Sequence, residues 1–393
     1  MTLDRRSFLG ATALLTASPM LFAQAATERR FIFILQRGAA DGLNTLIPYA
    51  EPAYAQWRGA LAIDAASTLK LDGSFALHPS LLTLRELYGA GQASFIHAVA
   101  SPYRDRSHFD GQNVLETGGQ TPYQLKDGWM NRLLALLPRR GKDAIAFSPA
   151  VPLALRGAVE VATYGPSALP QANDDLMARV EQLYAQDAQL HGLWSTALEA
   201  RGMAAGMAGG MGGGMGGQDS RQDPAALGRM AASFLARADG PRLAMIETSG
   251  WDTHSGQTAR LAGQLKGLDN LIAGLHLGLG AAWSQTVILV ATEFGRTVAA
   301  NGTGGTDHGT GAAAMLLGGA VQGGQILADW PGLRQANLLD GRDLRPTLNL
   351  DALMAALCAE AFALDPERTA RLLFPGAARG KALPTLLRLT ASA

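Results

Sequence analysis

The 393-residue sequence has one cysteine, few aromatic residues (6%) and no excess of either charge. Cys358 has no partner for an intramolecular disulfide, so stability must come from a packed core, with bound metal as a further source. Lys and Arg number 33, as do Asp and Glu, and this balance argues against nucleic acid as the main partner. Cys358 lies in the apolar segment Leu350–Phe362 and is expected to be a small buried hydrophobe.

Long apolar runs are also missing, apart from one mild stretch at the N-terminus. Arg5 and Arg6 precede the stretch Phe8–Phe22, which ends in Ala23-Gln24-Ala25, an A-x-A cleavage pattern. The stretch is too mild for a comfortable membrane span of about 20 strongly apolar residues. An uncleaved helix or anchor is the alternative to an export signal read by its paired arginines. We predict a twin-arginine signal peptide over residues 1–25, no stable membrane span, and a periplasmic or extracellular domain over residues 26–393.

Apolar runs of strand length alternate with segments of helical character. Strands are expected at Arg30–Gln36, Ala93–Val99, Leu243–Glu247, Thr286–Thr292 and Ala312–Leu317, with two short strands within Asp143–Ala158. Helices are expected at Pro79–Tyr88, Gly128–Leu137, Asn173–Arg201, Pro224–Ala238, Gly256–Trp283 and Asn349–Phe362. The alternation predicts an α/β fold with a mainly parallel central sheet and helices on both faces.

One segment, Gly202–Gln218, is almost entirely Gly, Ala and Met. Glycine at this density disfavours both helix and strand, so we predict a flexible loop over residues 202–218. Methionine recurs there at every fourth position from Met203 to Met215. Thioethers are ligands of Cu(I), but expansion of a short repeat in a flexible loop explains the pattern more simply.

Acidic and histidine residues follow the expected strands. Asp41 comes after the first strand, Asp252 and His254 after Leu243–Glu247, and Glu293 after Thr286–Thr292, while a glycine-rich loop leads to His308. Ligands of open α/β sheets bind beyond the carboxyl ends of the strands, so these side chains are expected to share one crevice. Clustered carboxylates repel one another unless a cation neutralises them, and Asp, Glu and His are ligands of Zn²⁺ and Mn²⁺.

Ser107 precedes an expected helix after the strand Ala93–Val99. It is either the N-cap of that helix or a nucleophile, because a helix N-terminus and a nearby metal would stabilise an alkoxide. His108 is an alternative reactive or ligating group. Arg37 and Arg296 are candidate substrate-binding residues, because guanidinium groups pair bidentately with phosphate and sulfate.

These segments resemble motifs of the alkaline phosphatase and sulfatase superfamily, and more closely a family of twin-arginine-exported proteins of uncharacterised function. The resemblance rests on RGAADGLN (37–44), RSHF (106–109), GWDTH (250–254), TEFGR (292–296) and TDHG (306–309). It implies an alkaline-phosphatase-like fold with one or two divalent metal ions beyond the sheet. The resemblance also implies a nucleophile at Ser107 and metal ligands at Asp41, Asp252, His254, Glu293 and His308.

The sequence departs from the superfamily pattern at two places that bear on the metals. Phe294 stands where a histidine usually follows the acidic residue, which weakens one metal site. The Asp252–His254 spacing is shorter than usual, and the Cys/Ser-Pro-Arg motif of sulfatases is absent.

Three functions are compatible with these features. The first is an exported metal-dependent hydrolase of phosphate or sulfate esters, acting on a small anionic substrate. The second is a non-catalytic exported binding or assembly protein with a protein partner and a degraded metal site. The third is phosphoryl transfer or isomerisation, as in mutases that resemble the same superfamily.

Overall fold

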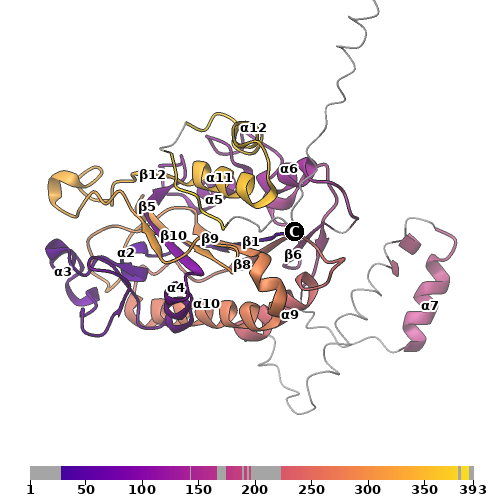
Figure 1. The fold of residues 1–393 in the computed structure, drawn as a ribbon, viewed down its shortest axis with the longest axis horizontal. Helices are drawn as coiled ribbons and strands as arrows, with labels where there is room; N and C mark the ends of the chain where they lie inside the picture. The colour runs from indigo at the N-terminus through magenta and orange to yellow at the C-terminus, as the bar shows by residue number, and fades with distance from the viewer. Residues whose placement is uncertain are drawn as a thin grey trace, which may run out of the picture.

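The computed structural model describes residues 28–141, 143–165, 174–187, 190–192, 194–195, 223–378 and 382–388. Its centre is a nine-stranded sheet in the order β11-β5-β10-β9-β1-β8-β6-β7, with β12 paired to β5 (Figure 1). Of these strands, only β10 is antiparallel to its neighbours, β5 and β9. The predicted mainly parallel α/β sheet is therefore confirmed.

The strands of the large sheet are short apart from those at its centre. Their bounds are β1 Arg30–Gln36, β5 Ala93–Ala100, β6 Ala144–Phe147, β7 Ala162–Thr163, β8 Leu243–Thr248, β9 Thr286–Thr292, β10 Ala312–Leu317, β11 Gln325–Leu327 and β12 Leu348–Asn349. A second sheet of three strands contains β2 Leu46–Ile47, β3 Leu69–Lys70 and β4 Ala76–Leu77.

The helices are α2 Gly42–Thr45, α3 Pro52–Arg58, α4 Leu82–Gly89, α5 His108–Thr117, α6 Trp129–Leu136, α7 Asp174–Tyr184, α9 Pro224–Leu235, α10 Gln257–Leu279, α11 Leu350–Phe362 and α12 Pro366–Leu373. Helices cover both faces of the large sheet, whereas α7 lies apart from it (Figure 1). Short 3-10 segments lie at η1 Gly59–Leu61, η2 Leu153–Leu155, η4 Gly280–Gln285 and η5 Gln335–Asn337.

Side chains of β1 point alternately into two hydrophobic cores, because successive residues of a strand face opposite sides of the sheet. Phe31 and Phe33 pack in a core that includes residues of α6, α11 and α12. Ile32 and Ile34 pack in the other core, against residues of α4, α9 and α10. Figure 1 shows these two groups of helices on opposite sides of the sheet. The apolar run Phe31–Leu35 of β1 is thus required by burial on both faces.

Most predicted elements match the structure within a few residues. The bounds of β1, β9 and β10 agree with the sequence prediction, and α11 begins one residue later than expected, after its N-cap Asn349. The prediction of two strands within Asp143–Ala158 was wrong in part: β6 forms, but the second half contains the 3-10 turn η2. The next short strand, β7, begins only at Ala162.

Two predicted features lie wholly outside the described residues. These are the signal peptide over residues 1–25 and the Gly/Met-rich loop over residues 202–218. Within the described ranges, no helix has the length and apolar character needed to cross a membrane.

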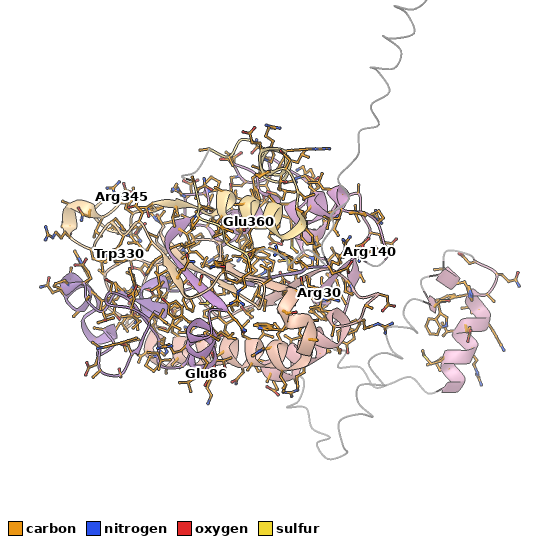
Figure 2. All side chains as sticks on the ribbon, in the orientation of Figure 1. Arg30, Glu86, Arg140, Trp330, Arg345 and Glu360 are labelled. Atoms are coloured by element: carbon orange, nitrogen blue, oxygen red, sulfur yellow. The ribbon has the colours of Figure 1, made fainter. Side chains whose placement is uncertain are left out.

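Packing at the two ends of the sheet involves different side chains, as Figure 2 shows. Trp330 lies at one end, where its ring packs against Phe75 at a centroid distance of 5.3 Å. Arg140 lies at the opposite end and pairs with Glu28.

Cys358 is fully buried in α11, as predicted, and burial raises the pKa of its thiol.

Candidate metal centre

Loops that follow four strands meet at one edge of the sheet. Strands β1, β8 and β9 are parallel neighbours, and β5 runs in the same direction because β10 is antiparallel to both β5 and β9. The loops approach one another closely: a Cβ on Gly38 would lie 2.7 Å from the backbone N of Asp252. A Cβ on Gly295 would lie 1.9 Å from the carbonyl oxygen of Gly311. Glycine is therefore required at both positions for the loops to meet.

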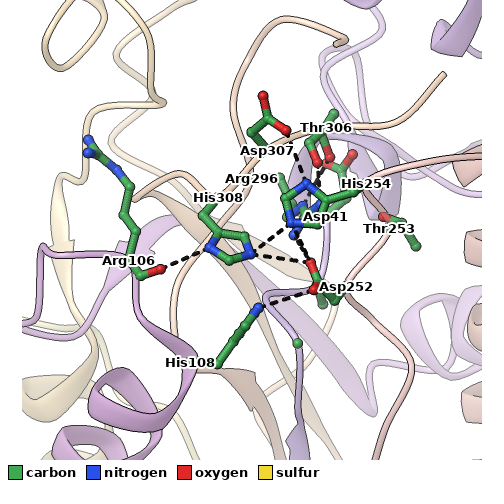
Figure 3. A network of polar contacts seen from close by, with 12 residues as sticks. Asp41, Arg106, His108, Asp252, Thr253, His254, Arg296, Thr306, Asp307 and His308 are labelled. Atoms are coloured by element: carbon green, nitrogen blue, oxygen red, sulfur yellow. Dashed lines mark hydrogen bonds and ion pairs between the residues drawn. The ribbon is translucent and has the colours of Figure 1, made fainter. Parts of the chain in front are cut away.

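The carboxylate of Asp252 is the centre of a polar cluster at this edge (Figure 3). Its Oδ1 lies 3.0 Å from His254 Nε2 and 3.3 Å from His308 Nε2, and its Oδ2 lies 3.4 Å from His108 Nε2. Arg296 Nη1 donates to the same Oδ1 at 2.6 Å. The Nε2 atoms of His254 and His308 are themselves 3.0 Å apart.

Each of the three imidazoles is held at Nδ1 by an oxygen atom, so that Nε2 points toward Asp252. The three pairs are His108 with Glu293 Oε1 at 2.8 Å, His254 with Asp307 Oδ1 at 3.0 Å, and His308 with the carbonyl oxygen of Arg106 at 2.8 Å. A carbonyl oxygen can only accept a hydrogen bond, so Nδ1 of His308 carries a proton. In the neutral ring its Nε2 is then a lone pair directed into the cluster.

Burial and charge act against each other in the cluster. Burial is the main cause that lowers the pKa of His308, whereas the hydrogen bond to Glu293 raises the pKa of His108. Burial alone would raise the pKa of Asp252, but the hydrogen bond and charge of Arg296 bring it below its usual value. Asp252 is therefore an ionised carboxylate facing imidazole nitrogens.

The nitrogen and oxygen atoms of the cluster have the spacing of metal ligands. In a tetrahedral zinc site with bonds of about 2.0–2.1 Å, two ligand atoms lie roughly 3.3 Å apart. Asp252 Oδ1, His254 Nε2 and His308 Nε2 form a triangle with sides of 3.0, 3.0 and 3.3 Å. One ligand atom each from His108, Asp252 and His308 also lie within 4.8 Å of one another. His108 Nε2 is buried and makes no hydrogen bond, and its contact with Asp252 Oδ2 is 3.4 Å long, so the atom is available to a cation.

Asp41, predicted as a metal ligand, has other partners. Arg58 binds it bidentately, with Nη1–Oδ2 and Nη2–Oδ1 distances of 2.5 and 2.9 Å, and both side chains are fully buried. Gln257 donates to Oδ2 at 2.5 Å, and the backbone N–H groups of Leu43 and Asn44 donate to Oδ1. Both oxygens of Asp41 are thus engaged as the N-cap of α2 and as an ion pair.

Asp41 is nevertheless connected to the cluster through buried hydrogen bonds. Gln257, which binds Asp41, accepts a hydrogen bond from Thr306 Oγ1 at 2.7 Å. Thr306 Oγ1 in turn accepts from Arg296 Nε at 3.1 Å, and Arg296 binds Asp252. The Asp41–Arg58 pair therefore lies one layer behind the cluster and supports Arg296.

Glu293 also has a supporting position. Its carboxylate is fully buried, and Oε1 accepts from His108 Nδ1, from the Gly38 N–H at 2.9 Å and from Gln112 Nε2 at 3.0 Å. Its Oε2 accepts from Thr292 Oγ1 at 2.9 Å. Although burial acts to raise the pKa of Glu293, these donors bring it below its usual value. Glu293 therefore orients His108 as an ionised acceptor.

The guanidinium groups of the two predicted substrate-binding arginines are bound to protein oxygens. Arg37 forms ion pairs with Glu116 at 2.8 Å and with Glu247. The Arg296 side chain has no exposed area and donates to Asp252 and Thr306. Ser107 lies at the N-cap position of α5, but its side chain makes no capping hydrogen bond.

The sequence leaves the role of His108 open and indicates no role for Asp307 or for the Arg106 carbonyl. All three residues lie in the RSHF and TDHG segments, but each forms its hydrogen bond with a residue from a distant part of the sequence. Phe294 stacks on His108 at a centroid distance of 5.1 Å and lies 5.3 Å from the ring of His308. Its ring is a wall of the cluster.

The fold and cluster define an α/β protein with a His/Asp centre at the carboxyl edge of its parallel strands. The chain matches the family described as "Protein of unknown function (DUF1501)" over residues 28–371, and it belongs to that family. No curated protein matches the chain.

Solved structures with a similar fold include sulfatases and phosphatases. PsFucS1 sulfatase from Pseudoalteromonas sp. is 13% identical, with a TM-score of 0.39 over 95% of this chain and 74% of that one. Alkaline phosphatase from the Antarctic bacterium TAB5 is 11% identical, with a TM-score of 0.33 over 74% of this chain and 92% of that one. Phosphonate monoester hydrolase of Agrobacterium radiobacter is 10% identical, with a TM-score of 0.32 over 90% and 78% of the two chains. At these values the likeness assigns no activity to this chain.

Proposed function

We propose that this chain is an exported hydrolase of phosphate or sulfate esters that depends on one divalent metal ion. His108, Asp252, His254 and His308 would hold the ion. The observation that carries the proposal is the convergence of three Nε2 atoms on one carboxylate, each with its Nδ1 fixed by an oxygen. Neutral imidazoles with lone pairs 3.0 Å apart repel each other unless a cation lies between them.

A proton is the alternative cation, and the geometry favours metal over it. His254 could be doubly protonated between Asp307 and Asp252. That state would leave His108 Nε2 with only its 3.4 Å contact to Asp252 Oδ2, whereas a metal ion uses this atom as well. Three imidazoles and one carboxylate suit zinc, with manganese as the second choice.

The arrangement supports one ion rather than two. The second carboxylate of the predicted site, Asp41, is neutralised by Arg58 in a fully buried pair. Glu293 is bound to His108 and three other donors. The charge of Asp41 is thus offset by Arg58, and the oxygens of both carboxylates already accept hydrogen bonds, so neither has a free oxygen for a second ion.

The surrounding residues have separate roles in the proposed reaction. A bound ion would polarise an oxygen of the phosphate or sulfate ester. Ser107 is the proposed nucleophile: its hydroxyl does not cap α5, and the N-terminus of that ten-residue helix favours an alkoxide. The side chains of His254 and Asp307, 43% and 53% exposed, mark the open side from which a small anionic ester would approach.

Elemental analysis of protein purified from its native compartment tests this proposal, together with a panel of phosphate and sulfate esters. We expect about one zinc or manganese ion per chain and metal-dependent turnover of one ester class. Protein without metal and without turnover on the whole panel would contradict the proposal.

The second candidate function is a non-catalytic exported binding or assembly protein with a protein partner. It is favoured by Arg37 and Arg296, because both predicted substrate-binding groups are bound to protein carboxylates. Protein that contains no metal and shows no turnover on the ester panel would support this function instead.

Export itself rests on Arg5 and Arg6 at the head of the signal-like segment. Replacing both with Lys should leave the precursor in the cytoplasm, since the twin-arginine transporter reads the pair. Cell fractionation and immunoblotting measure this, with the wild-type chain as control. Normal export of the double variant would contradict the twin-arginine assignment.

A further inference from the structure

A single buried carboxylate joins the two segments that contain His108 and His308. Asp343 is fully buried, and its Oδ2 accepts from Arg106 Nε at 3.1 Å and Nη2 at 2.8 Å. The same Oδ2 accepts from Thr310 Oγ1 at 2.8 Å. Arg106 lies two residues before His108, and Thr310 lies two residues after His308.

Arg106 adopts an unusual backbone conformation that serves His308. Its φ is +61°, in the left-handed region that residues with a side chain rarely adopt. In this conformation its carbonyl oxygen accepts from His308 Nδ1 at 2.8 Å. Neighbouring contacts must hold such a conformation, and the two hydrogen bonds from the Arg106 guanidinium to Asp343 do so. In Figure 3 the carbonyl of Arg106 faces His308 while its side chain points away from the cluster.

The residue next to Asp343 contacts the same histidine. Arg342 Nη2 donates to the carbonyl oxygen of His308 at 2.7 Å, and its Nη1 lies 3.2 Å from Asp343 Oδ1. The segment around Asp343 thus fixes both the backbone of His308 and the acceptor for its ring.

We propose that Asp343 is a positioning residue of the metal centre. It holds the Arg106 carbonyl against His308 Nδ1, which fixes the tautomer of His308 and directs its Nε2 into the cluster. Asp343 itself binds no metal in this proposal. The proposal rests on the proposed function only for its metal readout, because the tautomer of His308 is a property of the metal-free protein.

The test compares two aspartates that contact the same guanidinium. Asp343→Asn removes the buried charge, and the matched control Asp340→Asn changes a residue 70% exposed and 3.6 Å from Arg106 Nη2. Zinc affinity is measured in the full chain by competition with a chelator. We expect Asp343→Asn to bind zinc about 10–100-fold more weakly, the usual effect of losing a group that orients a ligand, at unchanged stoichiometry. Asp340→Asn should stay within about twofold of wild type.

A second measurement reports the tautomer directly. In the ¹⁵N spectrum of the metal-free wild type, His308 should be in the Nδ1–H form, and Asp343→Asn should show a mixture of both tautomers. Arg106→Ala should also weaken zinc binding, and it replaces Asp343→Asn in the test if that variant does not fold. The double variant should be no weaker than the weaker single variant, since both act through one contact.

Two results would overturn the proposal. One is an Asp343→Asn variant with wild-type zinc affinity and tautomer but a lower melting temperature, which would make the role structural only. The other is additive loss of affinity in the double variant. If wild-type protein binds no zinc, the proposed metal function fails, and the tautomer measurement alone decides the role of Asp343.

Discussion

The Nε2 atoms of His254 and His308 lie 3.0 Å apart and face the same carboxylate oxygen of Asp252. The Arg106 carbonyl accepts a hydrogen bond from His308 Nδ1, so Nδ1 carries the proton and Nε2 carries a lone pair in the neutral ring. Two such rings face each other stably only with a proton or a metal ion between them.

His308→Ala should abolish metal binding and, with it, any ester hydrolysis. The change removes one side of the ligand triangle and leaves His254 without its neighbour. Zinc should raise the melting temperature of the wild-type protein in a concentration-dependent way, and this shift should vanish in the variant. The matched control is His276→Ala, which changes an exposed histidine in the last turn of α10. A zinc-dependent shift retained in His308→Ala would contradict the ligand assignment.

Ser107→Ala should keep the metal and lose turnover. Because its side chain makes no capping hydrogen bond, the substitution should change the free energy of unfolding by less than about 0.5 kcal/mol. Asn349→Ala is the matched control, since Asn349 caps α11 by accepting from the Ala352 N–H at 3.1 Å. That substitution should cost about 1 kcal/mol in urea denaturation. Full activity of Ser107→Ala would leave water or another group as the nucleophile.

The sheet could be predicted from the sequence because burial on both faces requires continuous apolar runs. β1 and β9 are such runs, and their bounds agree with the prediction. The second strand expected within Asp143–Ala158 does not form because that segment turns as η2, where Ala154 and Leu155 supply core side chains without strand pairing. Apolar content alone does not distinguish these two forms of burial.

The edge of the sheet at which the candidate site lies could also be predicted, because strand order places Asp252 and Glu293 there. The role of each carboxylate could not, since it depends on partners distant in sequence. Glu293 binds His108, which is 185 residues away in the sequence, and Asp41 binds Arg58, which is 17 residues away. No local motif indicates that an acidic residue after a strand is already neutralised by a buried arginine.

Asp351→Asn should stabilise the protein at neutral pH. Asp351 is buried in the first turn of α11, its Oδ1 has no hydrogen-bond partner, and burial raises its pKa to about 7 from the usual 3.8. Between the pKa values of the unfolded and folded chains, the unfolded chain has released the proton that folded Asp351 keeps, so stability falls as the pH rises from about 4 to 7. Asparagine does not titrate, so the variant does not lose stability in this way.

The expected gain for Asp351→Asn is about 1 to 4 kcal/mol at pH 8 and close to zero at pH 4, the upper value corresponding to the full pKa difference. Urea denaturation at the two pH values measures it, with Asp365→Asn, at the exposed N-cap of α12, as the comparison. An equal effect of Asp351→Asn at both pH values would contradict a titrating Asp351.

The Asp41–Arg58 pair gives the last prediction, because it separates a structural carboxylate from a metal ligand. Arg58→Met should destabilise the protein by about 3–5 kcal/mol, since it leaves Asp41 as a buried charge without its partner. Arg371→Met, which breaks an exposed pair with Glu367, should cost less than about 0.5 kcal/mol. Asp41→Asn should lower stability as well but keep one zinc ion per chain with affinity within about tenfold of wild type. A metal ligand would behave differently: Asp41→Asn would then release the zinc while Arg58→Met strengthened its binding, and isothermal titration of the two variants distinguishes these outcomes.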